Sequence, residues 1–276
     1  IRKEDSSVKF TFLNNKEILK NSHFLNIENL IETKNLIKKI SPDIVIHCSA
    51  LSNIDFCENN KRKAESINDL GTKNIVEGCK ESNSKIVYIS TSFVFDGKKK
   101  YSENDNTSPS TFYGFTKFKG EEIIKDSNLP FLILRTDQPY SWIEQWQHTN
   151  SVIRVIDSLK KKKIFYEVND WYNVPTYVPD FVNATMKLIK LKKEGVFHVS
   201  GSDFLNRYDW AILTAKIFQL NPDLIKAINS SSLNLSAKRV NGNLSNEKLF
   251  RETGIKMRGI KEGLMEMFKA KHVSQK

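Results

Sequence analysis

The chain has 276 residues, of which 39% are hydrophobic and 27% are charged. This length and balance are typical of a soluble globular protein with one large or two modest domains, and they exclude a disordered or fibrous chain. No stretch approaches the roughly 18 consecutive apolar residues of a membrane span, so we expect no membrane partner.

The formal net charge of +11 raises the question of nucleic-acid binding. The lysine runs are scattered along the chain, at 98–100, 160–163 and 192–193. None of them is interleaved with the aromatic residues that single-strand binders use to stack bases. We therefore expect no nucleic-acid partner, although a diffuse positive field can attract an anionic small substrate. The three cysteines, Cys48, Cys57 and Cys79, have no metal-type spacing. We expect Cys48 and Cys79 to be buried in a strand and a helix of a reduced, cytoplasmic protein.

The first half alternates short apolar runs with longer helical periods, the pattern of a parallel sheet covered on both faces. The predicted order is strand 8–13, helix 27–40, strand 44–48, helix 61–82, strand 85–90, helix 113–125 and strand 131–135. This series predicts an α/β fold with a doubly wound, Rossmann-like parallel sheet.

The second half is less regular and predicts helices at 151–159, 178–191, 208–220 and 244–253, with a strand at 196–199. We expect residues 1–138 to form a dinucleotide-binding domain to which 180–201 return. Residues 139–179 and 202–276 would then form a smaller substrate-binding lobe.

Tyr113 and Lys117 stand four residues apart and so share one face of a helix. A fixed positive charge near a phenol favours the phenolate and lowers its pKa, so the tyrosine could exchange a proton with a carbonyl or alcohol oxygen. The pair alone is weak evidence, because a surface helix pair has the same spacing. Thr91, however, ends the preceding strand about 22 residues earlier, where parallel sheets bind ligands, and its hydroxyl can bind the same oxygen.

These motifs, taken together, resemble the dTDP-4-dehydrorhamnose reductase family of extended short-chain dehydrogenase/reductases. The resemblance runs from Val8 onward and includes 42–50, 68–74, 88–91, 94–97, 113–117, 134–136, 174–177 with Asp180, and 197–201. It implies an NADPH- or NADH-dependent reduction of the 4-keto group of a deoxy-sugar nucleotide, with a homodimer as the family-level assembly.

The resemblance also implies residue roles. Thr91, Tyr113 and Lys117 would be catalytic, with Lys117 also binding the nicotinamide ribose. Further residues would border the cofactor, namely Ser49, Ala50, Leu51 and Asn68. The substrate would meet Ser92, Gln138 and Arg239, whose guanidinium suits a diphosphate.

Several positions depart from the family pattern. Ser92 and Phe93 replace an aspartate and a tyrosine, Gln138 replaces the tryptophan after Arg-Thr-Ser, and Asn173 and Asn26 replace a glycine and an aspartate. These changes leave the triad intact and put the identity of the sugar in doubt.

The family also opens with a central strand, a glycine-rich turn and a helix that holds the pyrophosphate. Here the predicted strand 8–13 is followed only by Asn14-Asn15-Lys16. Removing a central strand would leave unpaired backbone groups on both sides. We therefore expect either a fragment of a longer protein or two flanking strands that have closed up with changed pairing.

Two further functions stay open. The absent glycine turn favours a non-catalytic nucleotide- or partner-binding subunit, like the β subunit of methionine adenosyltransferase. An epimerase or dehydratase is less favoured, because Ser92 and Phe93 offer no additional acid or base beside the threonine.

Overall fold

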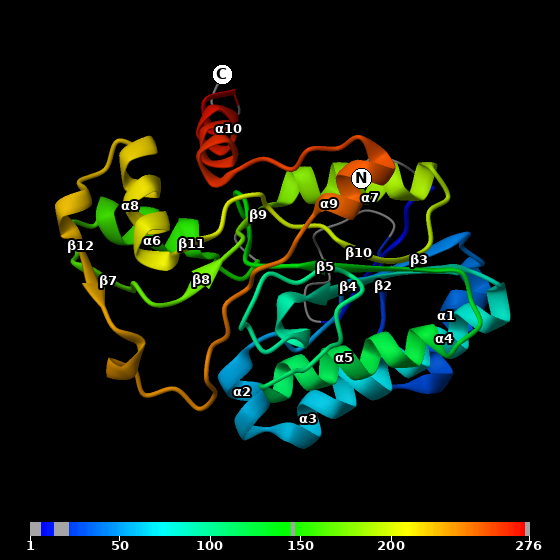
Figure 1. Ribbon diagram of the computed structural model, residues 1–276. Helices are drawn as coiled ribbons and strands as arrows, with labels where there is room; N and C mark the ends of the chain where they lie inside the picture. Colours follow the sequence, from blue (N-terminus) through cyan, green and yellow to red (C-terminus); the bar gives the residue numbers. More distant parts are fainter. Residues whose placement is uncertain (1–6, 14–21, 145–146, 274–276) are drawn as a thin grey trace.

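The computed structural model describes residues 7–13, 22–144 and 147–273. Its centre is a parallel sheet in the order β10-β5-β4-β3, which confirms the α/β, Rossmann-like fold class (Figure 1). The strands are β3 (Ile44–His47), β4 (Lys85–Thr91), β5 (Phe131–Thr136) and β10 (Gly195–His198). Strand β5 lies between β4 and β10, and its apolar run is buried on both faces of the sheet, with Ile133 in one core cluster and Leu132 and Leu134 in another, as its sequence predicts.

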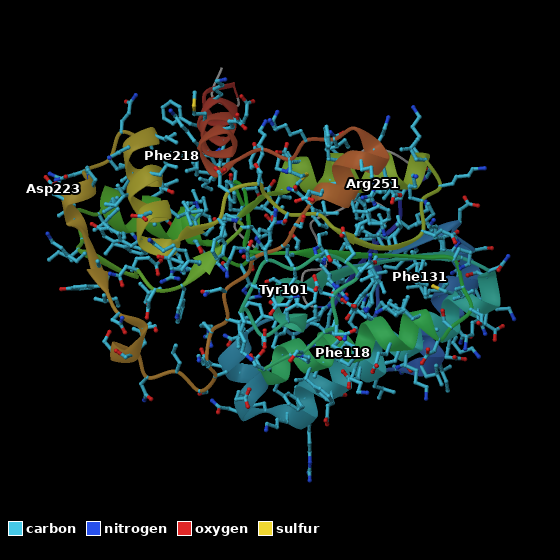
Figure 2. All side chains as sticks on the ribbon, viewed as in Figure 1. Tyr101, Phe118, Phe131, Phe218, Asp223 and Arg251 are labelled. Atoms are coloured by element: carbon cyan, nitrogen blue, oxygen red, sulfur yellow. The ribbon has the colours of Figure 1, made fainter. Side chains whose placement is uncertain are left out.

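Helices cover both faces of this sheet (Figure 1). On one face lie α1 (Leu30–Ile40), α4 (Gly71–Ser82) and α5 (Phe112–Lys125), and on the other α7 (Val178–Lys190) and α9 (Glu247–Thr253). The predicted helix 61–82 is instead three consecutive segments, with α3 (Lys61–Glu65) and a π-helical turn (Ser66–Leu70) before α4. Figure 2 shows Arg251 of α9 and Phe118 of α5 on opposite sides of the sheet.

The predicted first strand does not join the central sheet. Within the described residues, β1 (Phe10–Phe12) pairs in parallel with β2 (Ser22–Phe24) in a sheet of its own, and β3 pairs only with β4. The closed-up pairing is therefore not formed. Asn14-Asn15-Lys16 lie outside the described residues.

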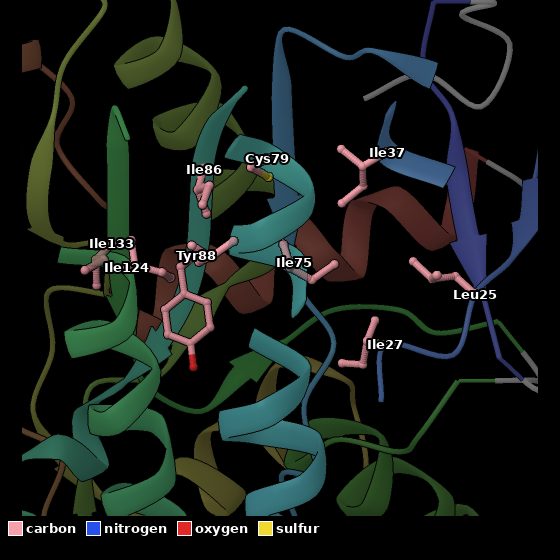
Figure 3. Packing of buried hydrophobic residues seen from close by; sticks show 10 residues of the cluster. Leu25, Ile27, Ile37, Ile75, Cys79, Ile86, Tyr88, Ile124 and Ile133 are labelled. Atoms are coloured by element: carbon pink, nitrogen blue, oxygen red, sulfur yellow. The ribbon is translucent and has the colours of Figure 1, made fainter. Parts of the chain in front are cut away.

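Side chains rather than backbone hydrogen bonds join the two sheets. Leu25 and Ile27, which follow β2, belong to the same buried cluster as Ile86 and Tyr88 of β4 (Figure 3). Ile37 of α1 and Ile75 of α4 also belong to this cluster. The core of the first half is thus continuous across the break in hydrogen bonding, because apolar burial does not require a shared ladder.

The second half adds a lobe beside the sheet. It contains α6 (Ser151–Lys160), α8 (Arg207–Ile217), α10 (Ile260–Val273) and the parallel pair β7 (Phe165–Val168) and β12 (Ile225–Ile228). It also contains two shorter strand pairs, β6 (Pro139–Tyr140) with β9 (Thr176–Tyr177) and β8 (Tyr172–Asn173) with β11 (Leu205–Asn206). Tyr140, Trp210 and Ile260 form its core.

One extended segment of the C-terminal part, residues 236–245, is called the strap below. It crosses from the lobe to the sheet side of the molecule (Figure 1). Gly242 N donates to Tyr172 O of β8, and Ser245 N donates to Tyr101 O. Ser236 N and Ala237 N both donate to the carboxylate of Asp55, in α2 (Ile54–Asn59). The strap therefore ties the lobe to the loops that follow the sheet.

Candidate functional site

The carboxyl ends of β3, β4 and β5 open into a cavity of about 620 Å³. Parallel sheets place ligands at this edge because several strand ends and their loops converge there. The cavity lining includes Thr91, Tyr113 and Lys117 from the sheet side. From the lobe and the strap it includes Gln138, Arg154, Trp171, Asn173, Arg207 and Arg239.

Local structure brings Thr91 and Tyr113 together. Thr91 ends β4, and Thr111 caps α5 by accepting a hydrogen bond from Gly114 N at 3.1 Å, which places Tyr113 in the first turn. A Cβ on Gly114 would lie 2.1 Å from Phe93 O, so only glycine allows this close approach. The Phe93 and Tyr113 rings contact edge to face at 5.8 Å.

The electrostatics of the pair differ from the sequence-based expectation. Burial raises the pKa of Tyr113 to about 12, opposed by a hydrogen bond with Thr91. Burial lowers the pKa of Lys117 to about 7, opposed by the charge of Glu121. The expected lowering of the tyrosine pKa is therefore not observed, because desolvation penalises the phenolate. At neutral pH Tyr113 carries its proton and can act as a donor.

Lys117 is held over an aromatic face. It is buried, at 3% exposure, and its Nζ lies 3.9 Å from the centroid of the Tyr88 ring. Such a contact stabilises an ammonium that has lost its water. One helical turn further along α5, Glu121 forms an ion pair with Arg135 of β5, with nitrogen–oxygen distances of 2.9 and 2.7 Å. This pair fixes α5 against β5.

Asn68 holds the loop after β3 by hydrogen bonds to the backbone of Leu51. Its Oδ1 accepts from Leu51 N at 2.8 Å, and its Nδ2 donates to Leu51 O and to Thr116 Oγ1. Ala50 of this loop lines the cavity. The expectation that Cys48 is a buried strand residue is wrong: β3 ends at His47, and Cys48 is exposed at the cavity, whereas Cys79 is buried in α4 as expected.

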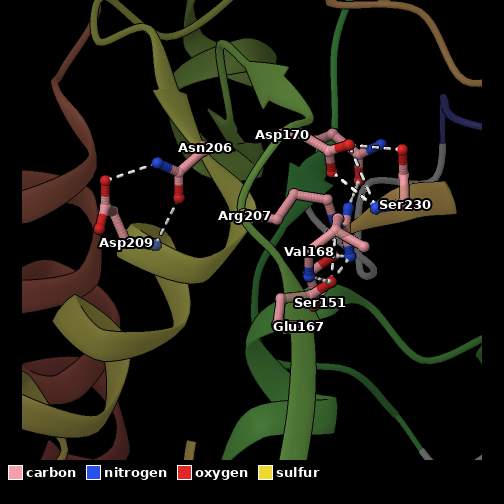
Figure 4. Close-up of polar contacts among 9 residues, drawn as sticks. Ser151, Glu167, Val168, Asp170, Asn206, Arg207, Asp209 and Ser230 are labelled. Atoms are coloured by element: carbon pink, nitrogen blue, oxygen red, sulfur yellow. Dashed lines mark hydrogen bonds and ion pairs between the residues drawn. The ribbon is translucent and has the colours of Figure 1, made fainter. Parts of the chain in front are cut away.

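Arg207 anchors the lobe side of the cavity (Figure 4). Its guanidinium donates to Glu167 at 3.1 and 3.3 Å and to Ser151 Oγ at 3.0 Å. It also donates to Gln138 Oε1 at 3.1 Å, and Gln138 has a left-handed backbone with φ 40°. Gln138 is therefore oriented by Arg207 rather than by a neighbour in the chain.

Arg239, which the sequence predicts as a substrate residue, lies on the strap and lines the cavity. Both of its terminal nitrogens donate to the carboxylate of Asp55, and Nη1 also donates to Ala237 O at 2.8 Å. The guanidinium lies 5.7 Å from the centroid of the Trp171 ring. The positive charge that was expected to face a diphosphate is thus paired with a carboxylate in this structure.

Comparison with known proteins places this site in a family. The family model described as "RmlD substrate binding domain" matches residues 10–273. The chain belongs to this family. The match confirms the resemblance to dTDP-4-dehydrorhamnose reductases. The Bacillus subtilis protein "Spore coat polysaccharide biosynthesis protein SpsK" is 29% identical over 244 residues, covering 88% of this chain and 84% of the relative.

Two further similarities bear on function. "Methionine adenosyltransferase 2 subunit beta" of Rattus norvegicus is 28% identical over 252 residues, covering 86% of this chain and 75% of the relative. The crystal structure of dTDP-4-dehydrorhamnose reductase from Bacillus anthracis in complex with NADP superposes with a TM-score of 0.85 at 27% identity. That superposition covers 90% of this chain and 89% of the other.

Two of the departures from the RmlD family pattern, Ser92 and Asn173, meet at Asp137. Ser92 is 1% exposed and donates to Asp137 Oδ1 at 2.7 Å, and Asn173 Nδ2 donates to Asp137 Oδ2 at 3.0 Å. A carboxylate thus still lies next to Thr91, although it comes from the end of the neighbouring strand. The absence of an acid or base in the segment 92–93 does not remove such a group from the site.

Sequence reasoning missed Asp137, Arg207 and Asp55. Asp137 had a usable signal, because it lies two residues after the end of the predicted strand 131–135. Arg207 begins α8 and Asp55 lies in the first turn of a six-residue helix, and neither position has a pattern that points to the cavity.

In the part of the chain that the structure describes, no helix is long and apolar enough to cross a membrane.

Proposed function

We propose that this chain is an NAD(P)H-dependent reductase that acts on the 4-keto group of a deoxy-sugar nucleotide. The observation that carries the proposal is that Thr91, Tyr113 and Lys117 line a single cavity at the strand ends of a Rossmann-like sheet. Membership of the RmlD family supports the class of substrate. Proteins with this fold catalyse many different reactions, so the proposal rests on these three residues and not on the fold alone.

The three side chains divide the work of carbonyl reduction. Tyr113, protonated at neutral pH, donates its phenolic proton to the carbonyl oxygen as negative charge develops there. The hydroxyl of Thr91 donates a hydrogen bond to the same oxygen and shares that charge. Lys117, when protonated, places a buried positive charge beside the tyrosine and stabilises the phenolate that remains.

The sheet side of the cavity fits the nicotinamide half of the cofactor. Lys117 is a buried donor that suits ribose hydroxyls, and Cys48, Ala50 and Ile89 supply a mostly apolar wall. When bound, the nicotinamide cofactor supplies the hydride. We include Leu51 and Asn68 as supports of this wall, because Asn68 fixes Leu51, and the exposed Ser49 because it lies between the lining residues Cys48 and Ala50.

The lobe side would hold the sugar nucleotide. Arg154, Arg207 and Arg239 all line the cavity there. Arg207 and Arg239 are also paired with Glu167 and Asp55, so we propose Arg154 as the guanidinium that meets the diphosphate oxygens directly, with the other two contributing positive charge. In this proposal residues 1–138 with 180–201 form the cofactor domain, and 139–179 with 202–276 form the substrate lobe.

A second candidate is a nucleotide- or partner-binding subunit without turnover. Its support is the similarity to methionine adenosyltransferase 2 subunit beta, which is as high as that to the reductases. The separation of β1 and β2 from the central sheet also favours it, because dinucleotides bind beside the first strands of this fold.

Titration of NADPH and NADH, monitored by quenching of tryptophan fluorescence, tests whether the cofactor site is formed, and a turnover assay then distinguishes a reductase from a binding subunit without turnover. The reductase proposal predicts saturable binding and turnover of dTDP-4-dehydrorhamnose. Tyr113→Phe should then lose about a hundredfold or more in kcat while it still binds the cofactor. The matched control is Tyr166→Phe, at a residue that is 58% exposed and outside the cavity lining, which should retain full activity. A folded protein that binds neither cofactor would overturn the reductase proposal.

A further inference from the structure

Asp137 is a buried carboxylate at the edge of the cavity that the proposed reaction does not use. It is 2% exposed and follows β5 directly. Its Oδ1 accepts from Ser92 Oγ at 2.7 Å, and its Oδ2 accepts from Asn173 Nδ2 and from Val174 N, both at 3.0 Å. Gly242 of the strap packs so closely that a Cβ there would lie 2.3 Å from Oδ2. The protein itself therefore satisfies and encloses this group.

The carboxylate determines how Asn173 is oriented. Asp137 accepts each of these three hydrogen bonds, so the amide turns its NH₂ group toward Asp137 and its carbonyl oxygen away. The backbone of Asn173 is also fixed, because β8 pairs with β11 at Leu205. The amide oxygen is consequently a rigid acceptor whose direction the network selects.

That oxygen lacks a partner. Asn173 is 3% exposed and lines the cavity, and its Oδ1 is buried without a hydrogen bond from any described residue. Leaving a buried acceptor unpaired costs about 1–3 kcal/mol, so such atoms call for an explanation. An unpaired acceptor with a fixed orientation, in a residue that lines the cavity, is explained by a donor on the ligand.

We infer that Ser92, Asp137 and Asn173 form a specificity site in which Asn173 Oδ1 accepts a hydrogen bond from a hydroxyl group of the substrate's sugar ring. The inference rests on the proposed function. The ring is the part concerned because Ser92 directly follows Thr91, and Thr91 pairs in register with Thr136, next to Asp137. Asn173 thereby binds the hydroxyl close to the carbonyl that is reduced. Asp137 and Ser92 act as positioning residues that hold the Asn173 side chain.

The test compares dTDP-4-dehydrorhamnose with its 2-deoxy and 3-deoxy analogues. Wild-type protein should prefer the full substrate over one of the two analogues by about tenfold in kcat/KM. Asn173→Ala should reduce that ratio to within about twofold while it retains turnover of the deoxy analogue. The control is Asn221→Ala, a cap residue of the short helix Pro222–Leu224 outside the cavity lining, which should retain the wild-type ratio.

The outcomes separate this inference from the function on which it rests. A wild-type protein that turns over all three sugars with the same kcat/KM, or an Asn173→Ala variant that keeps the wild-type ratio, overturns the specificity site alone. A folded wild-type protein that neither binds nor reduces any of the sugars overturns the proposed function and the inference with it. If Asn173→Ala does not fold, Asn173→Ser keeps a donor for Asp137, lacks the amide oxygen and should show the same loss of ratio.

Discussion

Asp55 and Arg239 are 184 positions apart in the sequence and form a bidentate ion pair beside the cavity. Asp55 also accepts from Ser236 N at 3.0 Å and Ala237 N at 3.2 Å. Arg239 holds the pKa of Asp55 below its usual value, so the pair stays ionised at neutral pH. This single carboxylate therefore attaches the first part of the strap to α2.

The first prediction concerns that attachment. Asp55→Asn keeps the size of the side chain and removes its charge, so Arg239 loses its ion-pair partner and the strap opens more often. Hydrogen exchange of backbone amides in 236–240 should become faster by about tenfold, which corresponds to a charged hydrogen bond of moderate strength. Asp223→Asn in the short helix Pro222–Leu224 is the control and should leave that exchange unchanged. Equal exchange in wild type and Asp55→Asn would show that the pair does not hold the strap.

A second prediction follows from the buried ammonium of Lys117, whose pKa burial lowers to about 7. Between that value and the ordinary value near 10.5, an unfolded chain binds a proton that the folded chain releases. The lysine therefore destabilises the fold, fully below about pH 7 and not at all above about pH 10.5. Lys117→Met should accordingly stabilise the protein, with a gain that is largest at low pH and disappears at high pH.

Urea unfolding at about pH 6, 8 and 10 measures this difference. The control is Lys73→Met on the exposed side of α4, which removes a lysine charge that is not buried. A Lys117→Met gain that is the same at all three values would mean that burial does not disfavour the charged lysine. A site residue that lowers stability is expected where function rather than folding selects the residue.

A third prediction concerns the ion pair of Glu121 and Arg135, which are 0% and 2% exposed. Burial alone would raise the pKa of Glu121, but the hydrogen bond and charge of Arg135 outweigh it and lower the pKa. Glu121→Gln leaves the guanidinium without a counter-charge in the core and should reduce the free energy of unfolding by about 3–5 kcal/mol. Glu122→Gln changes the adjacent, half-exposed residue and should alter it by less than about 1 kcal/mol. Equal effects in urea unfolding would contradict a structural role for the buried pair.

The central elements were predictable because each is a local pattern. Strands β4 and β5 are continuous apolar runs with turn residues on both sides, and their predicted bounds agree with the structure to within one residue at each end. Strand β2 is only three residues long, and α10 places charged residues and Gly263 among its apolar positions, so neither has a strong period. Local pattern is weakest where an element depends on what packs against it.

The candidate site divides in the same way. Thr91, Tyr113 and Lys117 were identified because strand, spacing and chemistry lie within one short segment. The contact of Ser92 with Asp137 depends on the register that sets Thr91 against Thr136, and the contact of Asp55 with Arg239 joins opposite ends of the chain. No sequence period encodes such pairs, because they arise only when the sheet and the strap are in place.

The last prediction tests whether the start of α5 sets the geometry of the triad. A Cβ at Gly114 would lie 2.1 Å from Phe93 O and 2.9 Å from its carbonyl carbon, and backbone atoms cannot move aside as a side chain can. Gly114→Ala should therefore push α5 away from the 91–93 segment and lower kcat/KM by about tenfold or more, because Thr91 and Tyr113 no longer meet at one oxygen. Overpacking should also lower stability by about 1–3 kcal/mol.

Gly78→Ala is the matched control: its Cβ would meet the Ile37 side chain of α1 at 2.6 Å, away from the cavity. It should affect stability without changing kcat/KM, since the Ile37 side chain can rotate and the strand ends stay in place. If Gly114→Ala retained full activity, the close contact at Phe93 would not determine how the triad is assembled.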